Sequence, residues 1–139
     1  MNKPDIIKHP HLDERTIQFG ILGMWICEQL PQGYAGKNVA DQLFRSSTSV
    51  AANYAEASEP ESDADFIHKM KIALKELKES RAWLRFASKL VHDTFIEEVI
   101  RESYEIQNMM GASIKKRGYR GWTSPASPKI AFPLLKIEH

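Results

Sequence analysis

The sequence predicts an all-α protein, an up-down-up-down antiparallel four-helix bundle with an irregular C-terminal tail. Three observations predict this fold. Apolar and small residues recur every three or four positions through most of residues 12–116. Serine, threonine or aspartate precedes several of these segments, where a helix N-cap is favoured. The connections between the segments are short, which favours antiparallel neighbours.

Length and composition point to one domain. The chain has 139 residues, enough for a modest core. Its 19 Lys and Arg nearly balance 18 Asp and Glu, so any nucleic-acid contact must use a local patch. Cys27 is the only cysteine, which excludes an internal disulfide and a cysteine-based metal site. The longest apolar run, 19–27, is about half of a membrane span. We therefore expect a cytoplasmic protein without membrane contact.

The first half of the chain predicts a lead-in and two helices. Residues 1–11 contain two prolines and no periodicity, which indicates an extended segment. The first helix should begin near Asp13, as its cap, and run to Leu30. Its apolar arc is wide, which predicts burial on two sides. A Pro- and Gly-containing loop precedes the second helix, 37–57. The centre of that helix, 45–49, consists of poor helix formers and needs tertiary contacts.

The third helix dominates the chain and should run from a Ser62–Asp65 capping pair to about His92. It contains three series at helical spacing. The first, here the core seam, is Phe66, Met70, Ala73, Leu77, Ser80, Leu84, Ala87 and Val91. The second, the mixed seam, is Ile72, Glu76, Glu79, Trp83, Phe86 and Leu90. The third, the basic stripe, is Lys71, Lys75, Lys78, Arg85 and Lys89. We expect the core seam to face the monomer interior and the mixed seam to face the second helix or another subunit.

The fourth helix should begin at a Thr94–Glu97 capping pair and run to about Lys116. Its expected inward positions are Val99, Ser103, Ile106 and Met110. From residue 117 to 139, Gly and Pro exclude a regular helix while several apolar residues remain. Two interpretations stay open for this tail, a flexible segment or an arm docked on its own or a neighbouring bundle.

Two long motifs resemble a known family. Residues 42–57, QLFRSSTSVAANYAEA, are similar to a helix with the pattern QLxRSxxSxxxNxxEA, and residues 62–84 are similar to the next helix of the same proteins. These are the four-helix-bundle proteins encoded in intervening sequences of some bacterial 23S rRNA genes. The accessory protein of diversity-generating retroelements, which binds a reverse transcriptase and nucleic acid, is related to them. Tyr54 and Ser58 depart mildly from the pattern. The resemblance spans about residues 12–114 and implies a ring, with a pentamer favoured, and no known catalysis.

A polar constellation accompanies the first motif. Residues on one face of the second helix, with two glutamates of the mixed seam, are expected to form a structural network; the alternative is ligand binding. Its members are Arg45, Ser49, Asn53, Glu56, Glu76 and Glu79.

The chemistry of known catalytic and metal sites is not evident in the sequence. Asp65-x-x-His68 has the spacing of a metal-ligand pair in helical bundles, but it lacks the second pair and further carboxylates. A serine in mid-helix lacks the sharp turn of a hydrolase nucleophile. We expect no catalytic residue, no metal and no cofactor.

Basic residues indicate a nucleic-acid surface. Besides the basic stripe, the end of the fourth helix and the start of the tail contain four cations interleaved with two aromatics, a combination suited to single-stranded RNA or DNA. These residues are Lys115, Lys116, Arg117, Tyr119, Arg120 and Trp122. A solvated helix face and a favourable helix C-terminus are the alternatives. We expect an oligomeric, non-catalytic protein that contacts RNA or DNA, or alternatively a scaffold for a protein partner.

Overall fold

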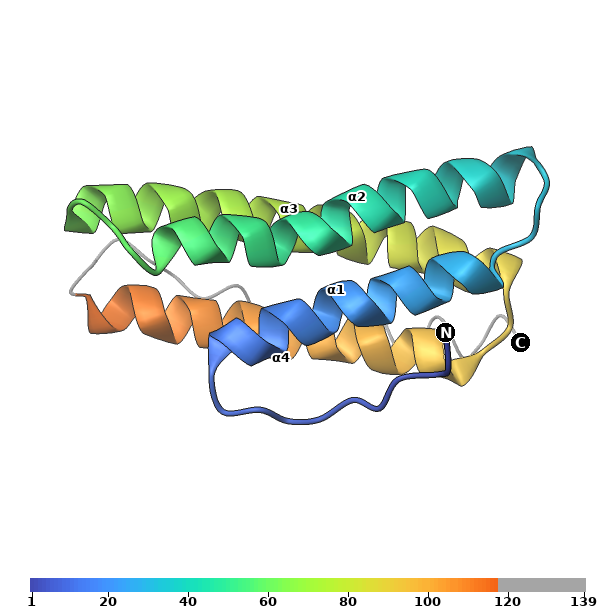
Figure 1. The fold of residues 1–139 in the computed structure, drawn as a ribbon, viewed down its shortest axis with the longest axis horizontal. Coiled ribbons are helices and arrows are strands. Elements are labelled where there is room, and N and C mark those ends of the chain that lie inside the picture. The colour runs from blue at the N-terminus through green and yellow to red at the C-terminus, as the bar shows by residue number, and fades with distance from the viewer. Residues whose placement is uncertain (118–139) are drawn as a thin grey trace.

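The computed structural model describes residues 1–117, which contain the helices α1 (Leu12–Gln29), α2 (Tyr34–Ala57), α3 (Asp63–Leu90) and α4 (Thr94–Lys116). Successive helices are antiparallel and form two layers, α2 with α3 and α1 with α4 (Figure 1). α4 packs against both α3 and α1 and so closes the bundle. The predicted all-α four-helix bundle is confirmed. The residues of the tail after Arg117 lie outside the described part of the chain.

Two helix caps differ from the prediction. α1 begins after His11, which makes no side-chain capping hydrogen bond, so the predicted Asp13 cap is wrong. α4 is capped by Asp93, whose Oδ1 accepts a hydrogen bond of 2.9 Å from Phe95 N. The predicted cap Thr94 is therefore the first helical residue. A carboxylate at this position both satisfies an amide and complements the helix dipole.

The predicted start of α3 is confirmed. Ser62 Oγ accepts a hydrogen bond from Asp65 N at 3.0 Å. The Asp65 carboxylate in turn accepts one from Glu61 N at 3.1 Å. Two backbone amides are thereby satisfied before the first turn closes. By contrast α2 begins at Tyr34, one turn before the predicted Lys37.

The interior of the bundle is formed largely by α3 and α4. Every residue of the core seam is buried except Val91, which is half-buried. The expected inward positions of α4 are all buried: Val99, Ser103, Ile106 and Met110. Each large apolar side chain among them contributes about 1.5–3 kcal/mol by leaving water.

α1 and α2 approach closely at Gly23 and Ser47. A Cβ added at Gly23 would lie 2.3 Å from Ser47 Oγ, so a larger residue would push the helices apart. Ser46 and Ser47 are fully buried, and Ser46 Oγ donates to Gln42 O at 2.9 Å. The packing of these serines against α1 explains why the centre of α2 remains helical despite its poor helix formers.

The apolar arc of α1 is not buried on two sides, contrary to the prediction. Phe19, Leu22 and Ile26 lie in the core. Ile17 and Ile21 are 57% and 38% exposed, because within residues 1–117 no helix covers their side of α1. No described helix is long and apolar enough to cross a membrane.

Residues 1–11, here the N-terminal arm, run along the groove between α1 and α4 (Figure 1). Ile7 N donates to Gln18 Oε1 and Gln18 Nε2 donates to Ile7 O, both at 2.9 Å. Lys3 Nζ lies 4.5 Å from the Phe95 ring centroid and 3.8 Å from Asp93 Oδ1. The extended lead-in is therefore fixed to the bundle at both of its ends.

Candidate nucleic-acid interface

The basic stripe lies on the surface of α3. All five of its residues, Lys71, Lys75, Lys78, Arg85 and Lys89, are exposed. They are spaced 4, 3, 7 and 4 positions apart over about five turns, so they follow one side of the helix with one position, Ala82, uncharged. Its neighbour, the half-buried Arg81, turns toward α4. The five cations therefore form one solvent-exposed row on α3.

A shallow hollow of about 260 Å³ opens within the stripe. Lys71, Lys75 and Lys78 surround it, and the buried Leu74 lies among them. Lys75 and Lys78 form no ion pair within the described residues. Three ammonium groups around a small concave surface attract an anionic ligand more strongly than the same groups on a flat face.

The basic end of α4 lies beside the first turn of α3. Arg117 Nη1 donates to Asp63 Oδ1 at 3.1 Å, and its guanidinium carbon lies 4.4 Å from the Phe66 ring centroid. Lys115 and Lys116 are exposed. The other predicted members of this segment, Tyr119, Arg120 and Trp122, lie outside the described residues.

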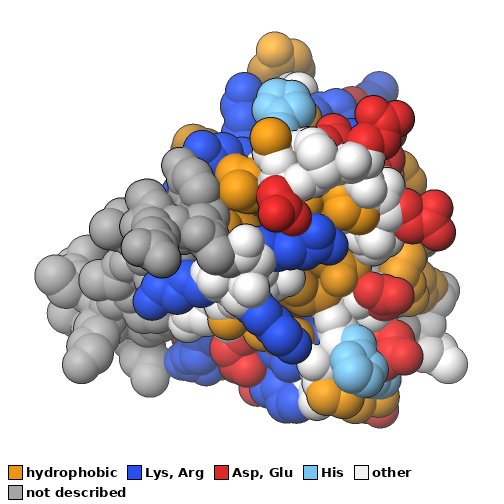
Figure 2. Space-filling view, turned by 90° about the vertical axis from the view of Figure 1, so that its left-hand side faces the viewer, with side chains coloured by type: hydrophobic (Ala, Val, Ile, Leu, Met, Phe, Trp, Pro, Cys, Tyr) orange, Lys and Arg blue, Asp and Glu red, His pale blue; other side chains and the backbone are white. Residues whose placement is uncertain are grey.

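This end of the molecule has no uniform charge. Figure 2 shows it from the side where α2 joins α3 and α4 ends, with Lys and Arg side chains among hydrophobic ones and the acidic side chains mostly to the right. Exposed acidic residues, including Glu59, Glu61 and Asp63, lie in and after the α2–α3 connection. The field of the α4 end is therefore weaker than its own three cations alone would produce.

Arg45 meets the two predicted glutamates across the α2–α3 contact. Its Nη1 donates to Glu76 Oε2 at 3.4 Å and its Nη2 donates to Glu79 Oε1. The Arg45 side chain is 51% exposed, so this pairing is a surface network worth less than about 1 kcal/mol per pair. Ser49 Oγ and Asn53 Nδ2 instead donate to carbonyls of their own helix, and Glu56 is exposed.

The apolar members of the mixed seam are incompletely covered in the monomer. Phe86 is 57% exposed and Ile72 is 36% exposed, while Trp83 and Leu90 are half-buried. The Trp83 and Phe86 rings contact each other with centroids 5.4 Å apart. A partly exposed aromatic pair beside a set of paired charges has the composition of a protein interface.

The sequence analysis missed a buried charge network between α1 and α4. The Glu102 carboxylate is fully buried and accepts hydrogen bonds from Arg15 Nε at 2.7 Å and Arg15 Nη2 at 3.0 Å. Lys8 Nζ contacts Glu102 at 2.9 Å and Glu105 at 2.7 Å, and Arg15 Nη1 donates to the His9 carbonyl. Burial alone would lower the pKa of Arg15 and of Lys8, but the two glutamates outweigh it and raise both pKa values.

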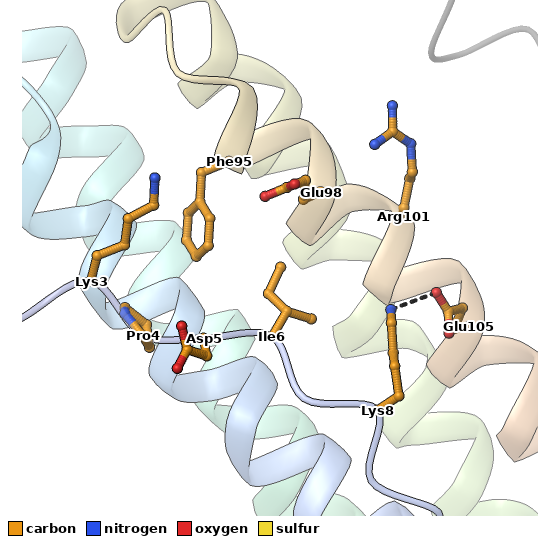
Figure 3. Close-up of a pocket in the computed structure, with 9 residues that line it drawn as sticks. All are labelled: Lys3, Pro4, Asp5, Ile6, Lys8, Phe95, Glu98, Arg101 and Glu105. Carbon is orange, nitrogen blue, oxygen red and sulfur yellow. Dashed lines mark hydrogen bonds and ion pairs between the residues drawn. The ribbon is translucent and has the colours of Figure 1, made fainter.

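A groove of about 520 Å³ lies beside this network, between the N-terminal arm and α4. Figure 3 shows Phe95 and Ile6 facing each other across it and Lys8 reaching Glu105. Its lining contains both cations and carboxylates, among them Lys3 and Arg101 and the acidic Asp5 and Glu98. Because the charges of this groove are mixed, it is less suited to a polyanion than the hollow on α3.

Two side chains considered for other chemistry have structural roles. Asp65 caps α3 and lies 3.3 Å from Lys69. Cys27 Sγ contacts Ala40 O at 3.2 Å, and burial raises the pKa of its thiol to about 11, so little reactive thiolate forms at neutral pH. Within residues 1–117 no three His, Cys, Asp or Glu side chains are placed to hold a metal ion.

Comparisons with known proteins give the family. The model of the 23S rRNA-intervening sequence proteins matches residues 17–112. The chain belongs to this family. A solved structure from Bacteroides thetaiotaomicron, a protein of unknown function from the S23 ribosomal protein family, is 30% identical with a TM-score of 0.68. The alignment covers 76% of this chain and 99% of that one.

The family relationship covers the helices but not every candidate residue. The matched range of this intervening-sequence protein includes the whole basic stripe, whereas Lys8, Arg15 and the cations after residue 112 lie outside it. A search of curated proteins finds no match. The assignment of a function therefore depends on the geometry of the chain itself.

Proposed function

We propose that this protein is a non-catalytic, oligomeric nucleic-acid-binding protein that contacts RNA or DNA through the basic stripe of α3. The supporting observation is the hollow on α3, where Lys71, Lys75 and Lys78 converge around Leu74 without a carboxylate in its lining. Lysine ammonium groups neutralise backbone phosphates and release their counterions, which supplies most of sequence-independent affinity.

The separation of the basic stripe from the glutamates of α3 is a second reason to expect a polyanion. The glutamates of α3 lie on its other side, where Arg45 neutralises them. Lys75, Lys78 and Arg85 keep their charge unbalanced within the described residues. A single-sign stripe therefore persists on a protein whose formal net charge is only +1.

Assembly strengthens this proposal. We infer a ring-shaped homo-oligomer, with a pentamer favoured, that buries the mixed seam at Phe86, Ile72 and Trp83. Several copies of the stripe in one particle would bind one strand multivalently, so a modest affinity per subunit suffices. Native mass spectrometry and sedimentation at micromolar concentration test the assembly, and Phe86→Lys is expected to shift the particle to monomer. A monomeric wild-type protein would contradict it.

Salt-dependent binding tests the function. Fluorescence anisotropy with single-stranded RNA and DNA should show an affinity that falls with salt by about 0.7 logarithmic units per contacted phosphate. The triple variant K71Q/K75Q/K78Q should lose about two of these contacts and bind at least tenfold more weakly. The control K37Q/R45Q/R101Q removes the same charge elsewhere and should bind nearly as the wild type does. Absence of binding at low salt, or equal loss in both variants, would contradict the proposal.

A protein scaffold is the second candidate. An apolar groove of about 450 Å³ between the N-terminal arm and α1 includes the exposed Ile17 and Ile21. Recovery of one defined protein after nuclease treatment, abolished by Ile17→Glu and unaffected by K71Q/K75Q/K78Q, would favour this function over nucleic-acid binding.

A further inference from the structure

Arg81 lies next to Ala82, the position at which the basic stripe is broken, and contacts with α4 hold its side chain in one position. Its Nε donates to Ser103 Oγ at 2.8 Å and its Nη2 to Gln107 Oε1 at 2.7 Å. The guanidinium carbon lies 3.6 Å from the centroid of the Tyr104 ring. Arg81 Nη2 also donates to the Ser103 carbonyl at 3.5 Å. Three hydrogen bonds and one cation–π contact, all with α4, fix a side chain that otherwise has many rotamers.

The partners of Arg81 are all neutral. Within residues 1–117 it forms no ion pair, whereas Arg15, Arg45 and Arg117 each meet a carboxylate. Burial lowers the pKa of Arg81, and Tyr104 partly opposes that effect. A guanidinium nevertheless stays protonated in proteins. The α3–α4 contact therefore contains a half-buried positive charge without a counter-charge, an arrangement that a bound anion stabilises.

The position of Arg81 joins it to the other cations of the stripe. Lys78 lies three residues before it and Arg85 four residues after it, so both are its neighbours on the helix surface. The hydrogen bonds to Ser103 and Gln107 use Nε and Nη2, so the N–H groups of Nη1 take no part in them. The flanking cations are exposed, whereas contacts with α4 already orient Arg81. An oriented guanidinium loses less conformational entropy when it binds a phosphate.

We propose that Arg81 is the fixed phosphate-binding residue of the basic stripe, where it binds a backbone phosphate of a single-stranded nucleic acid between Lys78 and Arg85. This inference depends on the proposed function for the nature of the ligand, but the anion site itself follows from the neutral surroundings of Arg81. Charge-assisted hydrogen bonds from a guanidinium to phosphate oxygens are among the stronger polar contacts of proteins. The lysines attract the polyanion by their charge, and the oriented guanidinium of Arg81 fixes the position of one phosphate.

NMR spectroscopy of the arginine Nε–Hε groups tests the proposal on the unmodified chain. Titration with tripolyphosphate, and separately with oligouridylate and oligothymidylate of about twelve nucleotides, should shift the Arg81 signal at low salt. The signals of Arg15 and Arg45 should not move, because carboxylates already bind them. An Arg81 signal that is unchanged at saturation would overturn the proposal.

Two variants and a matched control give the second readout. R81Q should weaken oligonucleotide binding about tenfold and reduce the salt slope by about 0.7. R81K keeps the charge but loses the planar fork, so its affinity should lie between those of R81Q and the wild type. R45Q removes an arginine whose charge is already neutralised, and its affinity should stay within about twofold of wild type. Amide spectra verify that each variant is folded.

The outcomes separate this inference from the proposed function. If tripolyphosphate shifts Arg81 but no oligonucleotide binds, the anion site stands and the nucleic-acid function is wrong. If oligonucleotides bind equally to R81Q and wild type, the function stands and the role of Arg81 is wrong. If neither ligand affects the wild-type protein, both are wrong.

Discussion

Arg15 and Arg81 reach α4 from opposite sides, and their partners differ in charge. Arg15 on α1 binds the buried Glu102 carboxylate, whereas Arg81 on α3 binds the neutral Ser103 and Gln107. Glu102 and Ser103 are consecutive residues, so adjacent positions of one helix meet two different helices. The comparison shows the same side chain in two roles. One arginine completes a buried ion pair, and the other meets only neutral partners within residues 1–117.

The largest expected effect is the loss of Arg15. In Arg15→Met the Glu102 carboxylate remains buried with Lys8 as its remaining cation, so the free energy of unfolding should fall by about 3 kcal/mol. Denaturant unfolding followed by circular dichroism measures it. The double variant R15M/E102M removes both charges and should recover most of the loss. A double variant no more stable than R15M would show that shape, and not charge, dominates the contact.

Removal of residues 1–9 should cost about 2 kcal/mol of unfolding free energy. This deletion removes the Lys8 ion pairs, the Ile7–Gln18 hydrogen bonds and the half-buried Ile6, and it leaves Arg15 without the His9 carbonyl. Deletion of residues 1 and 2 alone is the control, because both are exposed. Equal thermal midpoints for both deletions would mean that the arm does not stabilise the bundle.

Replacement of Arg81 should affect stability less than replacement of Arg15. Arg81→Met leaves neutral groups without a donor, and Ser103 Oγ keeps its own hydrogen bond to Ile100 O. We expect a loss of about 1 kcal/mol. The same denaturant experiment compares R81M with R15M directly. If R81M lost as much unfolding free energy as R15M or more, Arg81 would be as important for stability as Arg15, contrary to this prediction.

The smallest expected effect is on acid stability. Burial alone would raise the pKa of Glu105, but Lys8 and Arg15 outweigh it, so its pKa in the folded protein is lower than the usual 4.5. Its stabilisation is thus complete above pH 4.5 and is lost as pH falls through the lower folded pKa. In Glu105→Gln, unfolding free energy should decline less steeply below that pH. If the unfolding free energies of the wild type and of Glu105→Gln changed in parallel with pH, this would contradict a stabilising role for the Glu105 carboxylate.

Periodicity was sufficient to predict the helices but not the polar contacts between them. The core seam repeats at helical spacing from Phe66 to Val91, so its inward face follows from local geometry. The pairs Arg15–Glu102 and Arg81–Gln107 depend on which helices are neighbours and in which register, which spacing along one helix does not encode. One signal was available. The polar inward position Ser103 required a partner, because buried polar groups are hydrogen-bonded.

The helix ends and α1 show a similar limit. Asp93 and Thr94 are both acceptable caps, and only the backbone geometry selects Asp93. The wide apolar arc of α1 predicts burial but does not indicate that Ile17 and Ile21 lie on an uncovered side. The N-terminal arm lacks periodicity because it is held by individual contacts and not by a repeated face.

The hydrogen bonds of the N-terminal arm also impose an order on folding. Lys8 and Glu105 are separated by 97 positions in the sequence, and Arg15 and Glu102 by 87. Contacts between helices adjacent in sequence close short loops and form early, whereas these contacts need nearly the whole chain. During synthesis the arm emerges before α4 but cannot dock until α4 exists. The arm therefore docks late although it precedes the helices in the sequence, and Glu102 gains its ion pairs only when the bundle closes.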